Sequence, residues 1–578
     1  MELFDYEKRH ADYVRTHLGE CTVLLRSNGA FPLDAPGKIA AYGCGVRGTV
    51  KGGTGSGEVN SRYFVTVEEG LRAAGFTITS TAWLDAYDAV RAEARKQFIK
   101  DVKAKARANG EMAMLAAMGA VMPEPDHDLP LDAEGDAAIY VLSRLSGEGN
   151  DRPVNGDVKL CASEKRDILA LNEKYKKFML VINTGSVVDL SEVSGVANIL
   201  VMSQLGSESG NGLADILLGQ QNPSGKLSTT WSAWEDYCTI GDFGGKADTR
   251  YREGVYVGYR YFDAVGKKAL YPFGYGLSYT SFKTVCDGVC VKGESVTVRA
   301  SVTNTGSRPG KEVVQVYLSA PWGKLDKPWQ DLAGFAKTAE LAPGEQGQVE
   351  ICFRLRDLAS YDEERSAFVL ESGDYIVRVG NSSAATTIAA VLTLPCEVVT
   401  LQARHCGGRP DFADWRPARR EAEEIGADVP ALPEEMYRII DDKQMHAVVD
   451  VGGDDRGALA LGRLAPSLMA EDDYEMVFVM NFYRPLTRTA DQLISVLREV
   501  ETASGMKVTA LLNNSNLGQM TAVSDIAETD ALAREVSEKT NLPLLGTTVR
   551  EDLINEIKGK VVHPMPIRLH FRDEWAIY

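Results

Sequence analysis

One glutamate, Glu148, stands in a stretch whose residue types could do acid–base chemistry. The stretch is SRLSGEGNDR, residues 143–152, and it places Glu148 between Gly147 and Gly149. Glycine on both sides lets the backbone turn sharply and come close to a ligand. Because an isolated loop glutamate is usually solvated and inert, the surroundings of Glu148 must decide between a chemical role and none.

The place of this stretch in the predicted fold favours a ligand-facing role. An apolar run, AAIYVL, comes directly before it and indicates a buried strand. In sheets of parallel strands, ligands bind outside the carboxyl ends of the strands. Glu148 follows such an end, with Asp151 and Arg152 beside it. These two residues could orient the segment or form an ordinary surface ion pair, and the sequence leaves both interpretations open.

A second candidate segment is KGGTGSGEVN, residues 51–60, which is rich in glycine and serine. Its exposed backbone amides would let a ligand approach, although a flexible loop has the same composition. It is not a phosphate-binding loop, because the GK[ST] ending is absent. Taken together with Glu148, this segment predicts part of a ligand-binding rim.

The elements that must position these residues follow an α/β rhythm. Short apolar runs that end in Gly, Ser or Asn indicate buried strands, and helical stretches such as residues 163–175 and 210–220 lie between them. The alternation predicts parallel strands with crossover helices, an α/β sandwich over residues 1–284. A long helix rich in Ala, Lys and Glu is expected in an insertion at about residues 85–125.

A β-rich part and a second α/β part follow the sandwich. Over residues 285–393 the apolar period changes to two, as in SVTVRASVTNTG, with Gly, Pro and Asn between the runs. This pattern predicts an antiparallel β-sandwich of fibronectin type III or immunoglobulin kind. Residues 394–428 are expected to be a linker that turns helical, and an α/β rhythm returns over residues 429–578. The predicted fold class is therefore multidomain α/β plus β.

Composition and charge exclude several classes of partner. The chain has 578 residues and a formal net charge of −18, which argues against nucleic acid or an anionic membrane surface as the main partner. The sequence shows no apolar run long enough to span a membrane and no signal peptide, so the cytoplasm is the expected location. Nine scattered cysteines without CxxC spacing predict reduced thiols and no metal site. No cofactor is expected.

Six segments of the first 282 residues share an order and spacing with a known family. They are GGTGSG, SRLSGEGNDR, VINTGSVVDL, LADILLGQQNPSGKL, EGVYVGYRYFD and YPFGYGLSYTSF. Together they resemble glycoside hydrolase family 3, the β-glucosidase type. The resemblance implies two of that family's domains, the α/β sandwich and the fibronectin-like module.

The resemblance also implies a reaction, the hydrolysis of O-glycosyl bonds. Retaining members of such families use two carboxylates about 5–5.5 Å apart. Glu148 is the implied general acid and base, and an aspartate on a (β/α)8 barrel is the implied nucleophile. The implied substrate is a β-glucoside or short glucan, and the sequence is compatible with a homo-oligomer. The implied substrate-binding residues are Thr54, Ser56, Asp151 and Arg152.

The barrel is the part that this sequence does not show. A barrel needs about 250 residues, whereas the sandwich starts near residue 1 and the part after the fibronectin-like module is shorter and differently patterned. We therefore expect weak or no turnover by this chain alone. Two alternatives stay open at this point: a non-catalytic carbohydrate-binding protein, and a defective fusion of two incomplete proteins.

The last part carries a resemblance of its own. Its segments HAVVDVGG and ALLNNSNLG resemble the later half of ParA/MinD/CobQ-type P-loop nucleotide-binding proteins. The resemblance implies Asp450 on the metal side, and Asn513 and Asn514 next to the base. The Walker A loop G-x-x-x-x-G-K-[ST] is absent, so phosphates would have no cradle. The expected fold is a partial P-loop-type α/β domain without Walker A, and a nucleotide-dependent ATPase relative is a further alternative.

Overall fold

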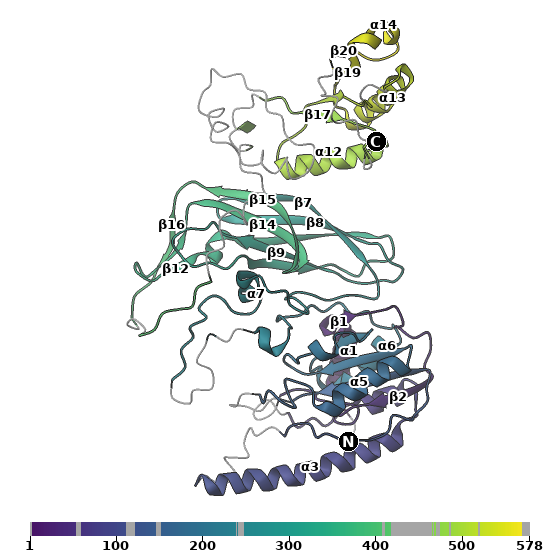
Figure 1. Cartoon of the computed structure of the whole chain (residues 1–578), viewed down its shortest axis with the longest axis vertical. Helices are drawn as coiled ribbons and strands as arrows, with labels where there is room; N and C mark the ends of the chain where they lie inside the picture. Colours follow the sequence, from purple (N-terminus) through teal and green to yellow (C-terminus); the bar gives the residue numbers. More distant parts are fainter. Residues whose placement is uncertain are drawn as a thin grey trace, which may run out of the picture.

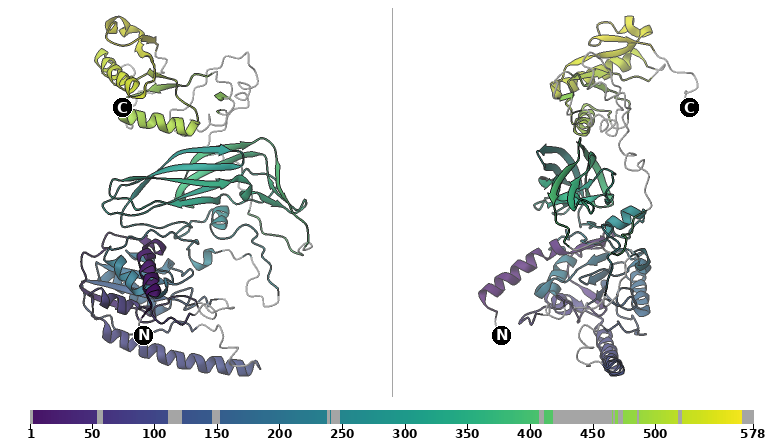
Figure 2. Two further views of the ribbon diagram at one scale, coloured as in Figure 1. Left: turned by 180° about the vertical axis from the view of Figure 1, so that it is seen from behind. Right: turned by 90° about the vertical axis from the view of Figure 1, so that its left-hand side faces the viewer.

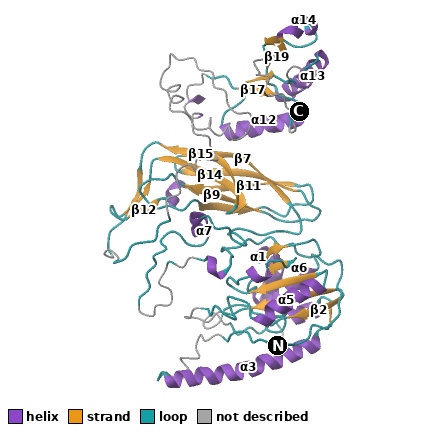
Figure 3. Cartoon of the chain, in the orientation of Figure 1, coloured by secondary structure: helices purple, strands orange, loops and turns teal. Residues whose placement is uncertain are grey.

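The computed structural model shows three parts along the chain: an α/β part, a β-sandwich and a second α/β part (Figure 1). The β-sandwich lies between the other two, and Figure 3 shows the change from mixed structure to strands and back. The structure describes residues 3–53, 59–110, 122–145, 152–237, 240, 248–406, 411–417, 465, 468–469, 474–484, 487–517 and 521–568.

The first part is built on a six-stranded sheet in the order β1-β6-β5-β4-β2-β3. The predicted parallel α/β sandwich is confirmed, because five strands run parallel. All residues of β4 and β5 are buried, as is typical of central parallel strands. The edge strand β1, which was not predicted, pairs antiparallel with β6. The bounds are β1 Val23–Arg26, β2 Lys38–Tyr42, β3 Thr77–Ile78, β4 Ala137–Ser143, β5 Phe178–Asn183 and β6 Ile199–Val201.

Helices accompany this sheet much as the sequence predicts. The longest, α3, has 28 residues and runs along one end of the first part (Figure 2). It begins ahead of the predicted insertion because Trp83, Leu84 and Tyr87 anchor its first turns in the core. The bounds are α1 Asp5–Cys21, α2 Val67–Ala73, α3 Thr81–Ala108, α5 Ala162–Lys174, α6 Ser209–Leu217 and α7 Tyr259–Val265.

The helix α1 joins the first part to the β-sandwich. Arg15 makes two parallel hydrogen bonds of 2.7 Å with Asp215 of α6, the fork geometry that guanidinium and carboxylate groups favour. Near the end of the helix, Glu20 accepts hydrogen bonds from Lys311 at 2.7 Å and from Lys337 at 3.4 Å, both in the β-sandwich. The helix is therefore fixed on both sides.

Two helices of the first part meet through glycine. A Cβ on Gly70 of α2 would lie 2.1 Å from the carbonyl carbon of Gly210, and a Cβ on Gly210 of α6 would lie 1.9 Å from the carbonyl oxygen of Thr66. Real Cβ atoms do not come this close to backbone atoms. The backbones of α2 and α6 are therefore in direct contact, and any side chain at these two positions would push the helices apart. The contact thus requires glycine on both helices.

We expect Gly210→Ala to lower the free energy of unfolding by about 1–3 kcal/mol. Overpacking of a tight contact has this effect, and it outweighs the smaller helix-propensity gain of alanine over glycine. Urea denaturation of the full chain measures the change. Gly195→Ala is the control, because a Cβ there would meet no atom within 4 Å. Equal stability of the two variants would contradict the expectation.

The second part is an antiparallel β-sandwich, as the sequence predicts. Its main sheets have the orders β10-β9-β14-β15 and β11-β8-β7. In β8 the alternate residues Val296, Val298, Ala300 and Val302 are all buried, as the period of two predicts. The bounds are β7 Phe282–Lys292, β8 Ser295–Asn304, β9 Val313–Ser319, β10 Asp331–Lys337, β11 Gln346–Arg354, β14 Gly373–Ser382 and β15 Ala385–Leu394.

The predicted linker at 394–428 does not begin as a linker. The strand β16 (Val398–Gln402) pairs with β13 (Ala367–Leu370), which in turn pairs with β12 (Ser360–Asp362). The β structure therefore continues to residue 402, because backbone groups of β16 complete the edge of β13. Farther on, the Trp415 ring packs edge-on against Tyr256 at 5.4 Å. Residues 418–428 lie outside the described residues.

The third part is a parallel sheet with the sequential order β17-β18-β19-β20. This confirms an α/β structure for the described residues of that part, whereas the predicted strand HAVVDVGG lies outside them. No sheet among the described residues closes into an eight-stranded barrel. The bounds are β17 Val477–Met480, β18 Ala510–Asn513, β19 Leu544–Arg550, β20 Pro564–Ile567, α12 Ala490–Ser504, α13 Val523–Thr540 and α14 Ile554–Ile557.

Two further expectations concern the whole chain. All eight cysteines that the structure describes are free thiols, as predicted. Within the described residues, none of the helices combines the length and apolar character that a bilayer crossing needs.

Candidate active site

The structure describes the surroundings of the predicted acid but not the acid itself. The strand β4 ends at Ser143, and the described chain continues through Leu145 and again from Arg152. The site is therefore described here through the residues that surround these two ends of the described chain, Leu145 and Arg152. The predicted site residues outside the described residues are Glu148, Asp151, Thr54, Ser56 and Asp450.

Arg144, directly after β4, is buried and bonded on all sides. Its Nη2 donates to Glu164 at 2.7 Å and its Nε to the carbonyl oxygen of Asp157 at 2.9 Å. Its Nη1 donates to the Ser143 carbonyl at 3.0 Å. Burial lowers the pKa of Arg144, but the charge and hydrogen bond of Glu164, together with the nearby Cys44 and Glu124, raise this pKa above its ordinary value. The guanidinium therefore stays charged inside the protein.

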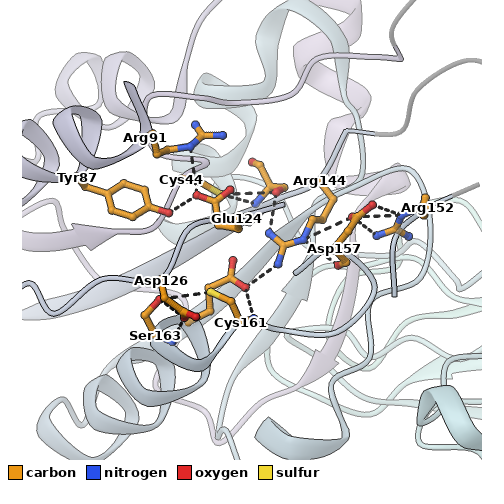
Figure 4. Close-up of polar contacts among 12 residues, drawn as sticks. Cys44, Tyr87, Arg91, Glu124, Asp126, Arg144, Arg152, Asp157, Cys161 and Ser163 are labelled. Atoms are coloured by element: carbon orange, nitrogen blue, oxygen red, sulfur yellow. Dashed lines mark hydrogen bonds and ion pairs between the residues drawn. The ribbon is translucent and has the colours of Figure 1, made fainter. Parts of the chain in front are cut away.

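Arg152, where the described chain resumes, meets a buried carboxylate. Its Nη2 donates to Asp157 Oδ1 at 2.7 Å, and its Nε lies 3.3 and 3.2 Å from the two carboxylate oxygens (Figure 4). Its Nη1 donates to Ser186 Oγ at 2.7 Å and to the Val187 carbonyl at 2.6 Å. The side chains of Arg152 and Asp157 are 14% and 1% exposed, so this ion pair is largely buried.

The start of α5 fixes the partner of Arg144. Glu164, in the first turn, also accepts a hydrogen bond of 3.0 Å from the backbone N–H of Cys161. Asp126 accepts from the N–H and the hydroxyl of Ser163 at 2.9 and 3.2 Å. Acceptors at these positions satisfy N–H groups that a helix start leaves unpaired. Arg144 is thus bound to a rigid helix end.

A second buried polar cluster lies beside Arg144. Glu124 accepts from the Tyr87 hydroxyl, and its Oε1 lies 3.1 Å from Arg91 Nε. Burial raises the pKa of Glu124, and Arg91 opposes this only in part. Burial likewise raises the pKa of the Cys44 thiol to about 12. Cys44 is therefore a protonated thiol at neutral pH and not a nucleophile.

The two predicted nucleotide-contacting asparagines lie at the end of β18. The Asn513 amide oxygen accepts from the Ser515 N–H at 3.2 Å and its hydroxyl at 2.7 Å. Its amide nitrogen lies 3.4 Å from the hydroxyls of Thr529 and Thr547. Asn514 accepts from the Thr548 hydroxyl at 2.7 Å. Both side chains are thus engaged within the protein.

Sequence reasoning missed most of the buried residues that define this region. Asp157 and Glu164 follow Glu148 in ordinary polar segments and carry no spacing signal. Arg144 was findable, because an arginine that closely follows a buried apolar strand needs polar partners where the strand ends. None of the His, Cys, Asp and Glu residues in the described segments gathers into a group that could hold a metal ion.

Comparison with known proteins identifies the first two parts. Residues 22–279 match the model of the glycosyl hydrolase family 3 C-terminal domain. These matched residues, 22–279, are called the family 3 domain below. Residues 312–383 match the fibronectin type III-like domain, so the predicted resemblance is confirmed for both parts. Neither match extends past residue 383, and the resemblance of the third part to P-loop proteins stays a prediction.

Curated proteins are similar in sequence to part of this chain. Beta-glucosidase A of Butyrivibrio fibrisolvens is 35% identical over 418 residues, which cover 63% of this chain and 48% of that protein. A Beta-glucosidase of Ruminococcus albus is 35% identical over 375 residues, with 63% of this chain and 38% of that protein covered. The chain thus spans about half the length, or less, of these relatives.

Solved structures agree with this assignment. Beta-glucosidase 3B from Thermotoga neapolitana, in complex with α-D-glucose, has 35% sequence identity and a TM-score of 0.57, with 68% of this chain and 55% of that one covered. A β-glucosidase from Paenibacillus barengoltzii has 26% identity and a TM-score of 0.59, with 93% of this chain and 63% of that one covered. Two thirds or more of the chain is therefore similar in fold to these solved β-glucosidases.

Proposed function

We propose that this chain is a glycoside hydrolase of the β-glucosidase type and that Glu148 is its general acid and base. The observation that carries the proposal is the family 3 domain at residues 22–279, which contains Glu148 in its SGEGNDR segment. Relatives that share this domain are β-glucosidases, one of them solved with glucose. The proposed substrates are β-glucosides or short glucans.

The proposed reaction has two steps and keeps the configuration of the sugar. In the first, Glu148 donates its proton to the glycosidic oxygen while that bond breaks and a nucleophilic carboxylate bonds to the anomeric carbon. In the second, Glu148 accepts a proton from the water that displaces this carboxylate. The residue thus ends the cycle protonated, as it began.

The nucleophile is the second requirement of this reaction. The resemblance implies an aspartate on a barrel, and the described residues contain no closed barrel. We propose that this carboxylate comes from a barrel that the present chain does not supply. Turnover by the chain alone is then slow, because loss of the nucleophile removes several kcal/mol of barrier lowering.

A hybrid enzyme tests the proposal. Residues 1–402 of this chain replace the matched segment of Butyrivibrio Beta-glucosidase A, and folding is checked by circular dichroism. We expect the hybrid to hydrolyse 4-nitrophenyl β-D-glucoside and the full chain alone to be at least about 10³-fold slower. A folded hybrid without turnover would contradict the assignment. A full chain as fast as the hybrid would show that it holds its own nucleophile.

Nucleotide binding is not part of this proposal. The amide of Asn513, one of the two residues predicted to meet a base, already contacts the backbone or hydroxyls of Ser515, Thr529 and Thr547. A side chain with these partners would have to break them to read a base, which has a free-energy cost.

A further inference from the structure

A pocket of about 490 Å³ lies between the family 3 domain and the β-sandwich. Its lining comes from the end of β1, from α7 and the segment after it, and from the turn between β14 and β15. Figure 1 shows α7 at this junction of the two parts. The volume lies in the range of pockets that enclose small molecules. The aromatic side chains in the lining are those of Tyr259, Phe262, Tyr271 and Tyr275.

Three hydroxyl groups of the lining have no hydrogen-bond partner among the residues that the structure describes. They belong to Tyr271, Ser382 and Ser383, which are only 6%, 2% and 5% exposed. Their oxygen atoms are not sealed off from the pocket, unlike the fully enclosed hydroxyl oxygen of Thr230. A polar group at such depth is costly unless it is paired. The three hydroxyls therefore indicate that a polar molecule occupies the pocket.

Arg26, at the end of β1, adds a charged donor to the lining. Its Nη1 donates to the Ser194 carbonyl oxygen, and no other hydrogen bond or ion pair engages this guanidinium within the described part of the chain. Burial raises the pKa of Tyr271 to about 12, and the charge of Arg26 opposes this only in part. Tyr271 thus keeps its proton at neutral pH and can both donate and accept.

The lining fits a sugar ring better than it fits other small molecules. A sugar ring has faces of C–H groups, which pack against aromatic side chains, and hydroxyls that donate and accept. Apolar walls with a few orienting polar groups are the usual construction of such a site. A purely apolar ligand would leave the hydroxyls and Arg26 unpaired. A compact anion would make no use of the aromatic walls and would also face Asp263.

The pocket lies at the edge of the family 3 sheet where its parallel strands begin. Arg26 pairs in register with Ile199, the first residue of β6. The strands β4, β5 and β6 run parallel, so Ser143 and Arg144, at the end of β4, lie at the other edge. The pocket is therefore separate from the buried cluster around Arg144.

We propose that this pocket is an accessory sugar-binding site, which takes a glucosyl unit of a β-glucan without taking part in bond cleavage. The aromatic side chains receive a face of the ring, and Tyr271, Ser382 and Ser383 pair with its hydroxyls. The choice of a sugar follows from the lining, whereas the choice of glucose rests on the proposed function.

Calorimetric titration of the full chain with cellobiose and laminaribiose, two glucose disaccharides with β linkages, tests the binding. Tyr271→Phe keeps the ring and removes only the unpaired hydroxyl. Tyr361→Phe is the control, because Tyr361 lies on β12 and outside the lining. We expect Tyr271→Phe to raise Kd by about 3–10-fold and Tyr361→Phe to leave it unchanged. No binding up to about 10 mM, or equal Kd values of the two variants, would overturn the proposal and leave only solvent in the pocket.

A blocking variant locates the binding independently of hydrogen bonds. Ala384, in the turn between β14 and β15, lines the pocket and is exposed, so Ala384→Trp should fold while its ring takes ligand space. We expect at least about 10-fold weaker binding. Ala342→Trp is the matched control, because Ala342 is exposed in a turn outside the lining. Unchanged binding by Ala384→Trp would place the sugar elsewhere and overturn the proposal.

The outcome is distinguishable from that of the hybrid enzyme. An active hybrid together with a full chain that binds no disaccharide would refute the accessory site and leave the proposed function intact. An inactive hybrid together with binding that Ala384→Trp abolishes would refute the proposed function and support the accessory site.

Discussion

Replacing Glu148 by glutamine in the hybrid enzyme should lower kcat/KM for methyl β-D-glucoside by about 10²–10⁴-fold. Glutamine has the size of glutamate but cannot give a proton to the leaving oxygen. For 2,4-dinitrophenyl β-D-glucoside the first step is spared, because this leaving group departs as a stable anion. The second step stays slow, since no base activates water. Steady-state kinetics with both substrates measure the two effects separately.

Two controls accompany this variant. Glu192→Gln removes an exposed carboxylate that pairs with Lys165 in the same domain, and it should leave both rates unchanged. Azide needs no base to attack, so it should restore turnover of the dinitrophenyl glucoside by Glu148→Gln. If Glu148→Gln behaves like Glu192→Gln, Glu148 is not the acid and base.

Arg144→Ala should lower the free energy of unfolding of the family 3 domain by about 3–5 kcal/mol. The change leaves the carboxylate of Glu164 buried without its cation and removes the second cation near Asp157. Removing one partner of a buried ion pair is costly because the remaining charge stays desolvated. Urea denaturation followed by tryptophan fluorescence measures the loss.

The matched control for Arg144→Ala is Arg299→Ala in the β-sandwich. Arg299 pairs with Glu350 at 2.9 Å, but the two side chains are 66% and 53% exposed. Exposed pairs contribute little because water solvates both partners, so we expect nearly unchanged stability. A similar effect of the two substitutions would mean that burial does not set the strength of the Arg144 contacts.

The sequence predicted well those elements whose pattern is local. The run AAIYVL is apolar throughout, which is what a strand buried on both faces requires, and it forms β4. The alternation in residues 295–304 likewise predicted the inward face of β8. In both cases the signal lies within one element, so no knowledge of distant partners is needed.

Elements defined by distant partners could not be predicted in this way. The strand β16 was expected to be linker because its strand character depends on pairing with β13, some 30 residues earlier. Asp157 gave no signal for the same reason, since its burial follows from two arginines that reach it from different sides. The role of Glu148 came from the family resemblance and its place after an apolar strand, and it stays a proposal.

The helix α1 has a practical consequence for where the family 3 domain should be cut. The family match begins at residue 22, one residue after α1 ends. A shortened protein that started there would leave Asp215 without Arg15 and would remove Glu20, the partner of Lys311 and Lys337. Expression boundaries that follow the matched region alone would thus remove the ion pair between α1 and α6 and one of the polar contacts with the neighbouring β-sandwich.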